Sequence, residues 1–175
     1  MDRYLAYLLG ITTDAHYICR PKKNEFGLEI EQNQREFILH IAALFKYVFN
    51  VDPSLKLRSR SWGTYYRMRI YSKNVYKRLR KYDFVTCLRA YSPYIQRELI
   101  RGFFDAKGSA HQQILFFNKD KRILSTIKTI LYCEFSIKSG KIFERGQTFI
   151  LPIYSEQDKQ LFMKTIKPRH PDKQY

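Results

Sequence analysis

The sequence has 175 residues, of which 45% are hydrophobic, and its 32 lysines and arginines against 16 aspartates and glutamates give a formal net charge of +16. This hydrophobic fraction excludes wholesale disorder, and no apolar run approaches the ~20 residues that a membrane-spanning helix needs. The positive charge predicts a polyanionic partner, with nucleic acid as the first candidate and an acidic membrane surface as the second.

Cysteine usage and the N-terminus indicate where the protein works. Cys19, Cys87 and Cys133 are far apart and are not arranged as metal-ligand pairs. An odd number of scattered cysteines favours reduced thiols in an intracellular protein. The N-terminus carries charge at Asp2 and Arg3 and lacks the apolar core of a signal peptide. We therefore expect an intracellular protein, cytoplasmic in a prokaryote or located in an organelle.

The first half of the chain alternates between helical and strand-like patterns. Residues 26–31 alternate apolar and charged side chains, which is typical of a half-buried strand. In chain order we predict a helix over 3–13, an extended pair that ends with the strand over 26–31, a long amphipathic helix from 33 or 34 to 50, strands over 55–58 and 65–71 around a turn at 61–63, and a short basic helix capped by Ser72.

The second half repeats this order. Ser92-Pro93 opens a helix, with proline at its first position. The elements that follow are a strand over 112–117, a helix over 121–132, strands over 135–138 and 143–153 around a turn at Ser139-Gly140, and a last helix capped by Ser155. Each half is thus α-β-β-α-β-β-α, which predicts an α+β fold with one half over 1–88 and the other over 89–175.

Each half also carries a glycine inside its first helix. Gly10 and Gly102 each cost about 1 kcal/mol relative to alanine at a helix interior, so their positions need a reason. An incidental role at a helix C-terminus is one reading. Because both halves carry the glycine, we instead expect the two helices to pack backbone to backbone on a pseudo-twofold axis.

Residues 100–108, Ile-Arg-Gly-Phe-Phe-Asp-Ala-Lys-Gly, resemble the second motif of a LAGLIDADG homing endonuclease, and residues 8–16, Leu-Leu-Gly-Ile-Thr-Thr-Asp-Ala-His, resemble the first. The length suits the small single-chain enzymes of intron or intein origin, of archaeal or organellar type, so the resemblance implies a monomer. The resemblance implies a saddle of two antiparallel sheets lying along the DNA major groove. It also implies an acid at the eighth motif position of each half, which holds the Mg²⁺ or other divalent ions used to cut each strand.

The chain departs from that pattern at both acids. Counted from the glycines, the eighth positions are Ala15 and Lys107, and neither side chain can hold a metal. Asp14 and Asp105 are the nearby acids, but they do not occupy equivalent positions in the two motifs. Two explanations fit the missing acids: natural decay to a protein that only binds DNA, or inactivating substitutions made to trap uncut DNA. A single substitution in each motif would restore its acid, which favours the second explanation.

Other residues of the family's catalytic pocket are polar here. The family often places a glutamine or lysine at the strand end before the long helix, where it orders water near the scissile phosphate. Gln32 and Asn33 stand there in the first half, and Asn118 and Lys119 in the second. For Asn33 and Asn118 helix capping is the alternative, and Lys119 is equally consistent with a phosphate contact.

Basic and polar side chains recur on the predicted hairpins, and a two-stranded ribbon fits the major groove. Arginine pairs with guanine and glutamine with adenine, while lysine mostly meets phosphate. The candidate DNA contacts are Arg58, Arg60, Tyr65, Arg67 and Arg69 on one hairpin, Lys138, Lys141, Arg145 and Gln147 on its counterpart, and Arg20, Lys22, Lys23, Gln112 and Gln113 on the first hairpins.

Three functions fit these observations. The first is site-specific recognition of double-stranded DNA with endonuclease ancestry, and Mg²⁺-dependent cleavage where the motif acids are intact. The second is a DNA-binding regulator that does not cut. The third is an RNA-binding maturase that helps its host intron to splice, because the same basic surface suits either polymer.

Overall fold

The computed structural model describes residues 1–61 and 63–174, with the backbone alone for Arg60. Trp62, which we placed in a turn, lies outside the described residues. The chain forms two compact units: the N-terminal unit, residues 14–82, and the C-terminal unit, residues 1–13 with 83–175. The first helix therefore belongs to the C-terminal unit. The division we predicted between residues 88 and 89 falls inside helix α4 (Phe84–Ala90).

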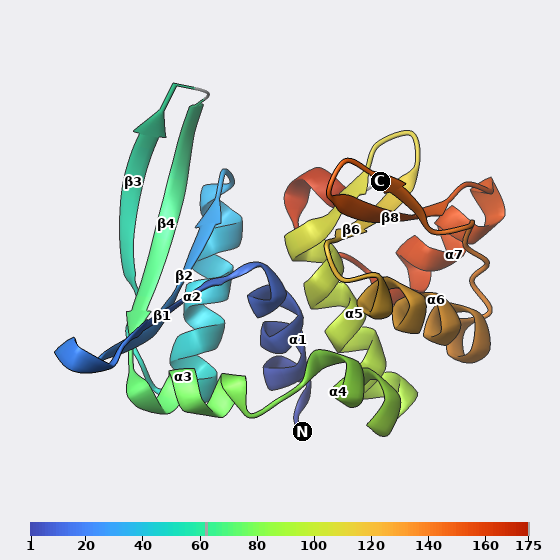
Figure 1. Cartoon of the computed structure of the whole chain (residues 1–175). Helices are drawn as coiled ribbons and strands as arrows, with labels where there is room; N and C mark the ends of the chain where they lie inside the picture. Colours follow the sequence, from blue (N-terminus) through green and yellow to red (C-terminus); the bar gives the residue numbers. More distant parts are fainter. Residues whose placement is uncertain (62, 175) are drawn as a thin grey trace. The chain divides into compact units, whose positions relative to one another are not determined.

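The N-terminal unit is a four-stranded antiparallel sheet with two helices (Figure 1). Its strands lie in the order β1-β2-β4-β3, and α2 and α3 both contact the sheet. Leu28, Ile30, Met68 and Ile70 are buried on the face toward these helices. The elements are β1 (His16–Arg20), β2 (Glu25–Gln32), α2 (Arg35–Phe49), β3 (Ser54–Arg60), β4 (Gly63–Tyr71) and α3 (Lys73–Arg80), with short 3₁₀ turns at Thr12–Asp14 and Pro21–Lys23.

The C-terminal unit repeats this sheet with the strand order β5-β6-β8-β7. Its central strands β6 and β8 are labelled in Figure 1. Aromatic rings fill its core: Phe116 of β6 lies 5.0 Å from Phe104 and 5.6 Å from Phe162, between ring centroids. Its elements are α1 (Arg3–Ile11), α4, α5 (Pro93–Lys107), β5 (Gly108–Ala110), β6 (Ile114–Asn118), α6 (Lys121–Phe135), β7 (Phe143–Arg145), β8 (Thr148–Ile153), α7 (Glu156–Ile166) and a 3₁₀ turn at Pro171–Lys173. The predicted α-β-β-α-β-β-α repeat is confirmed, with α4 added at the junction.

Helices α1 and α5 pack against each other at the two glycines. A Cβ atom on Gly10 would lie 2.3 Å from the carbonyl oxygen of Leu99 and 2.5 Å from the amide nitrogen of Phe103. A Cβ atom on Gly102 would lie 2.1 Å from the carbonyl oxygen of Tyr7. The two backbones thus touch where a side chain would separate them, which confirms the predicted role of both glycines.

One predicted strand is wrong. Residues 135–138 do not form a strand, because α6 continues to Phe135 and ends at Ser136 in the left-handed conformation. The hairpin turns instead between Arg145 and Thr148, which pair across the two-residue turn Gly146-Gln147. Gly146 has φ +62°, the positive value that a type II′ turn places at its first central residue. Ile137 is buried beyond the helix end, which gave residues 135–138 their strand-like pattern.

The described helices include none that is long and apolar enough to cross a membrane.

Candidate nucleic-acid interface

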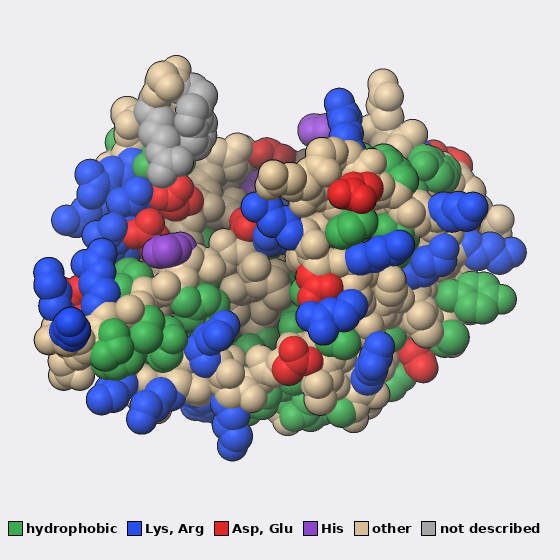
Figure 2. Space-filling model, in the orientation of Figure 1, with side chains coloured by type: hydrophobic (Ala, Val, Ile, Leu, Met, Phe, Trp, Pro, Cys, Tyr) green, Lys and Arg blue, Asp and Glu red, His purple; other side chains and the backbone are tan. Residues whose placement is uncertain are grey.

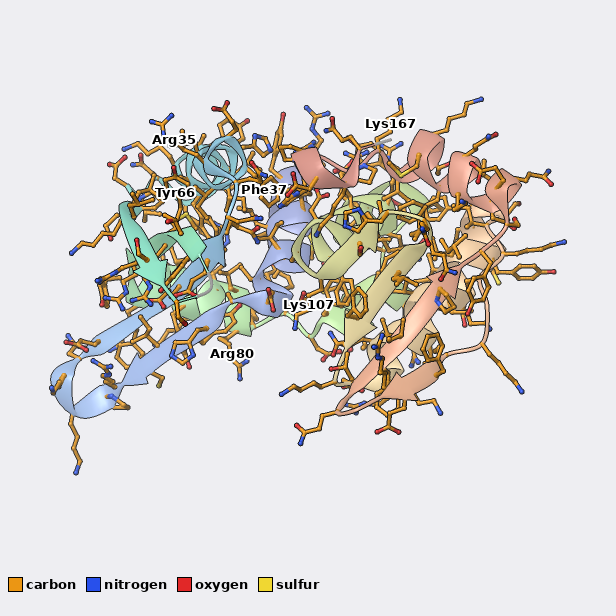
Figure 3. All side chains as sticks on the ribbon, turned by 90° about the horizontal axis from the view of Figure 1, so that it is seen from above. Arg35, Phe37, Tyr66, Arg80, Lys107 and Lys167 are labelled. Carbon is orange, nitrogen blue, oxygen red and sulfur yellow. The ribbon has the colours of Figure 1, made fainter. Side chains whose placement is uncertain are left out.

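The two motifs end at matching places in the fold. Ala15 stands one residue before β1, and Lys107 is the last residue of α5, directly before β5. Lys107 follows Ala15 by 92 positions, and Gly102 follows Gly10 by the same 92. Equal spacing on equivalent elements supports the motif register. Figure 3 shows Lys107 at the end of its helix.

Asp105, two residues before Lys107 on α5, is buried and bonded through both carboxylate oxygens. Its carboxylate accepts hydrogen bonds from the Tyr7 hydroxyl at 2.8 Å and from the backbone N–H groups of Arg169 and His170 at 3.0–3.2 Å. Burial raises the pKa of Asp105, while these hydrogen bonds oppose the shift. The carboxylate fastens the C-terminal tail to α5, so it is not directed toward a metal.

The C-terminal tail also covers the end of α5. The ammonium of Lys173 donates to the carbonyl oxygen of Phe104 at 3.0 Å and to that of Asp105 at 2.6 Å. Cations stabilise the end of a helix, where carbonyl groups lack partners. The guanidinium of Arg169 lies 4.7 Å from the ring centroid of Tyr7. The tail therefore adds positive charge close to Lys107 within the same unit.

The outward face of the N-terminal sheet, opposite its helices, carries a ladder of paired charges. Arg67 on β4 reaches Glu29 at 3.2 Å and Glu31 at 2.8 Å on the neighbouring strand β2. Arg69 forms an ion pair with Glu29. Arg67 and Arg69 share a face as predicted, but both are held by carboxylates and are less than one-third exposed. Tyr65 is buried on this strand, with its hydroxyl 3.3 Å from Arg67.

The edge strand β3 carries the more accessible cations of this unit. Lys56 and Arg58 are exposed and pair in register with Arg67 and Tyr65, so they share the outward face. No ion pair holds either of them within the described part of the chain. At the other edge, Arg20 forms an exposed ion pair with Glu25 at 3.1 Å. Lysine and arginine side chains are spread over the visible surface (Figure 2).

The outward face of the C-terminal sheet is different, because its centre is apolar. Leu115 and Phe117 on β6 pair with Pro152 and Ile150 on β8, and Phe143 on β7 pairs with Ile150. These residues alternate with Phe116, which faces the helices. We did not predict this apolar face from the sequence, although the run Ile114-Leu115-Phe116-Phe117 is typical of a strand with contacts on both faces.

Comparison with protein-family models and with curated proteins finds no match. Solved structures do match the fold. A structure of mesophilic variants of the homing endonuclease I-DmoI superposes with a TM-score of 0.76 at 22% identity, covering 94% of each chain.

The protein has the homing-endonuclease fold.

Two further structures share this fold. The homing endonuclease I-WcaI, bound to its DNA recognition sequence, gives a TM-score of 0.72 at 16% identity, covering 98% of this chain and 84% of that one. Full-length DUF199/WhiA from Thermatoga maritima gives 0.72 at 18% identity, covering 95% of this chain and 56% of that one. Further matching I-DmoI structures are complexes with DNA and Mn, Ca or Mg.

Divalent metal does not fit the motif ends of this homing-endonuclease fold. Ala15 offers only a methyl group and Lys107 an ammonium, which repels a cation. Asp105 is committed to the C-terminal tail, and Asp14 is exposed in the turn before β1. No group of three or more histidine, cysteine, aspartate or glutamate side chains gathers as a metal site in the part of the chain that the structure describes.

The pocket residues that we predict lie at or beside the ends of two strands. Gln32 is the last residue of β2, and Asn118 is the last residue of β6. Asn118 is buried, and its side-chain oxygen accepts from the backbone N–H of Asp120 at 2.8 Å, which turns the chain into α6. Asp120, rather than Asn118, caps α6. Lys119 is exposed beside it.

The remaining predicted contacts lie on turns more often than on strands. Lys22 and Lys23 form the β1–β2 turn, and Gln112 and Gln113 form the β5–β6 loop. Gln147 is in the β7–β8 turn, and only Arg145 lies on β7. Lys138 and Lys141, which we predict on the hairpin around Ser139-Gly140, do not lie on a hairpin. They precede β7 in an irregular segment, where the Lys138 N–H donates to Asp158 at 2.8 Å. The Arg60 side chain is outside the described part.

Proposed function

We propose that the protein binds a specific double-stranded DNA site through the outward faces of its sheets and does not cut it. The basic outward face of the N-terminal sheet carries this proposal. Lys56, Arg58 and the paired arginines of β4 lie on one face of a fold whose solved counterparts include DNA complexes. A net charge of +16 supplies the non-specific attraction to phosphate that precedes specific binding.

The motif ends support binding without cleavage. Metal-assisted hydrolysis needs oxygen ligands to orient water and to stabilise the leaving oxygen, and Ala15 and Lys107 supply none. Lys107 instead brings a fixed positive charge to the motif end, and Lys173 adds another at the same helix terminus. Lys173 is buried there, so we infer that Lys107 alone of the two meets phosphate directly and that binding needs no divalent ion.

A gel-shift selection from a random duplex library tests this proposal. We expect the full chain to enrich one sequence family, to bind it equally in EDTA and in Mg²⁺, and to leave both strands uncut. Enrichment of no duplex, or cleavage of both strands by the unmodified chain, would overturn the proposal.

The same experiment separates DNA from RNA as the partner. The selected duplex is competed against a structured intron RNA and against an unrelated duplex of equal length. At low competitor concentration, only an unlabelled copy of the selected duplex should displace the bound one. Tighter binding to the RNA would instead favour a maturase. The similarity to WhiA shows that this fold also occurs in a protein that is not named as an endonuclease. It does not favour DNA or RNA as the partner, so the competition experiment decides between them.

A further inference from the structure

The centre of the outward face of the C-terminal sheet consists of large apolar side chains. Leu115, Phe117 and Phe143 point away from the helices that cover the other side of the sheet. Phe143 is 42% exposed, and Leu115 and Phe117 are partly exposed. Ile150 pairs with both phenylalanines and is 5% exposed, since they flank it. These side chains form a continuous apolar strip on a surface that the sequence predicts to be basic.

Polar and basic side chains border this strip. Arg145 and Thr148 pair with each other on the same face as Phe143. Lys119 and Lys141 are exposed just beyond the strand ends. Glu144, the one acid on these strands, has the opposite alternation and lies on the other face. The outward positions of the four described strands therefore carry no acid, in contrast to the Glu29 and Glu31 ladder of the N-terminal sheet.

This combination suits a polyanion that also presents small apolar groups. The major groove of DNA is such a surface, because each thymine projects a methyl group and the phosphates line both edges. Phenylalanine and the threonine methyl are among the side chains that contact thymine methyl groups. A second copy of this chain would bring another basic border against the first, so its charge opposes self-association through this face.

We propose that the C-terminal sheet recognises thymine-containing DNA through the methyl groups, with Phe117 and Phe143 as the specificity-determining side chains. The proposal rests on the duplex binding proposed above. The two units then read their parts of the target differently: the N-terminal sheet by charged and polar groups, the C-terminal sheet by shape and apolar contact.

Replacing thymine with deoxyuridine tests this directly, because only the methyl group is lost and base pairing is kept. The full chain is used with the duplex that it selects, and each thymine is replaced in turn. A buried methyl contributes about 0.8 kcal/mol, so each contacted thymine should lose about four-fold in affinity on replacement. We expect the sensitive thymines to cluster in one part of the site.

Three variants assign the effect to the strip. Phe143→Ala and Phe117→Ala should each bind the thymine and uridine duplexes with equal affinity. Of the two substitutions, Phe143→Ala should disturb the fold less, because Phe143 is the more exposed residue. Tyr132→Ala removes an aromatic ring that is 61% exposed on α6 of the same unit, away from the strip, and should keep the four-fold preference. Thermal unfolding checks that each variant folds.

The inference is wrong if replacing thymine with deoxyuridine leaves the affinity unchanged at every position. It is also wrong if Phe143→Ala and Phe117→Ala keep the full preference for thymine. A dimer that Phe143→Ala abolishes would also overturn it, since the strip would then be a contact between copies. If the selection enriches no duplex at all, the proposed function fails first and this inference fails with it.

Discussion

Single residues on the N-terminal sheet show that the charge of a side chain does not by itself make it a DNA contact. Arg67 and Arg69 are spaced for one face, yet Glu29 and Glu31 neutralise them in the free protein. These ion pairs are half-buried, so the cost of desolvating the charges offsets much of their attraction and their net contribution to stability is small. Their larger effect concerns specificity, because an arginine that already faces carboxylates must exchange them for a base or a phosphate.

Substitutions should distinguish the exposed cations of β3 from the arginines of β4, which are paired with carboxylates. Lys56→Ala and Arg58→Ala should weaken binding to every duplex alike and lower the salt slope by about one each, as phosphate contacts do. Arg67→Ala should cost more, because it also removes the guanidinium that offsets the charge of Glu29 and Glu31 close to the DNA phosphates. Adding Glu31→Gln to Arg67→Ala should therefore recover part of the affinity. Equal dissociation constants for the single and double variants, measured across salt concentrations, would contradict this account.

His170 makes the C-terminal tail sensitive to acid. Burial, followed by the charge of Lys173, lowers the pKa of His170 to about 4. Its neutral Nδ1 accepts from the backbone N–H of Asp172 at 3.2 Å, which protonation would prevent. The unfolded chain takes up this proton near pH 6.5 and the folded chain near pH 4, so this group makes stability fall as pH decreases through that window.

His170→Asn keeps an acceptor near the Nδ1 position without a titrating ring. We expect the variant to lose less of its free energy of unfolding than the original chain between pH 6.5 and 4, measured by urea unfolding. Parallel pH profiles for the two proteins would show that the tail does not sense pH through His170.

At the scale of elements, the contact between α1 and α5 depends on the absence of two side chains. A Cβ on Gly10 or Gly102 meets backbone atoms at 2.1–2.5 Å, and backbone cannot rotate away as a side chain can. Gly10→Ala and Gly102→Ala should each lower the free energy of unfolding by about 1–3 kcal/mol through overpacking. Gly140→Ala is the matched control, because the closest atom to its Cβ belongs to the exposed ring of Tyr154. Comparable losses for all three variants would argue against close helix contact.

The elements that the sequence predicts well are those whose pattern arises within the element. Amphipathic spacing located α2, and Ser72 and Ser155 cap α3 and α7 as expected, each accepting a backbone hydrogen bond through its hydroxyl. The hairpin at 143–153 was misread because Ser139-Gly140 and Gly146-Gln147 offer similar turn chemistry, and strand pairing selects between them. The ion ladder on β2 and β4 and the tail bonded to Asp105 depend on residues 36 to 65 positions apart, which no local pattern reports.

For the whole molecule, electrostatics should dominate the affinity for DNA. With 32 basic against 16 acidic residues, binding should weaken steeply with salt, since each neutralised phosphate contributes about −0.9 to the slope of log K against log salt. A plot from 50 to 300 mM KCl should give a slope of several units for selected and random duplexes alike. A flat plot would mean that charge does not drive the association.

The motif ends decide whether the whole molecule can cut what it binds. Ala15→Asp with Lys107→Glu would restore an acid at both positions, directly before β1 and β5, on a fold that matches DNA-bound homing endonucleases. If Gln32 and Lys119 still order water, this double variant should cleave both strands in Mg²⁺ and neither strand in EDTA, read on a denaturing gel. Lys107→Glu alone should give at most a nick, because only one position then carries an acid.

Asp105→Asn is the control: it should loosen the C-terminal tail and lower thermal stability without affecting cleavage by the double variant, because the Asp105 carboxylate bonds to the tail. A double variant that binds the selected duplex but cuts neither strand would indicate long natural decay of the pocket, whereas restored cleavage would indicate that only the two acids were lost.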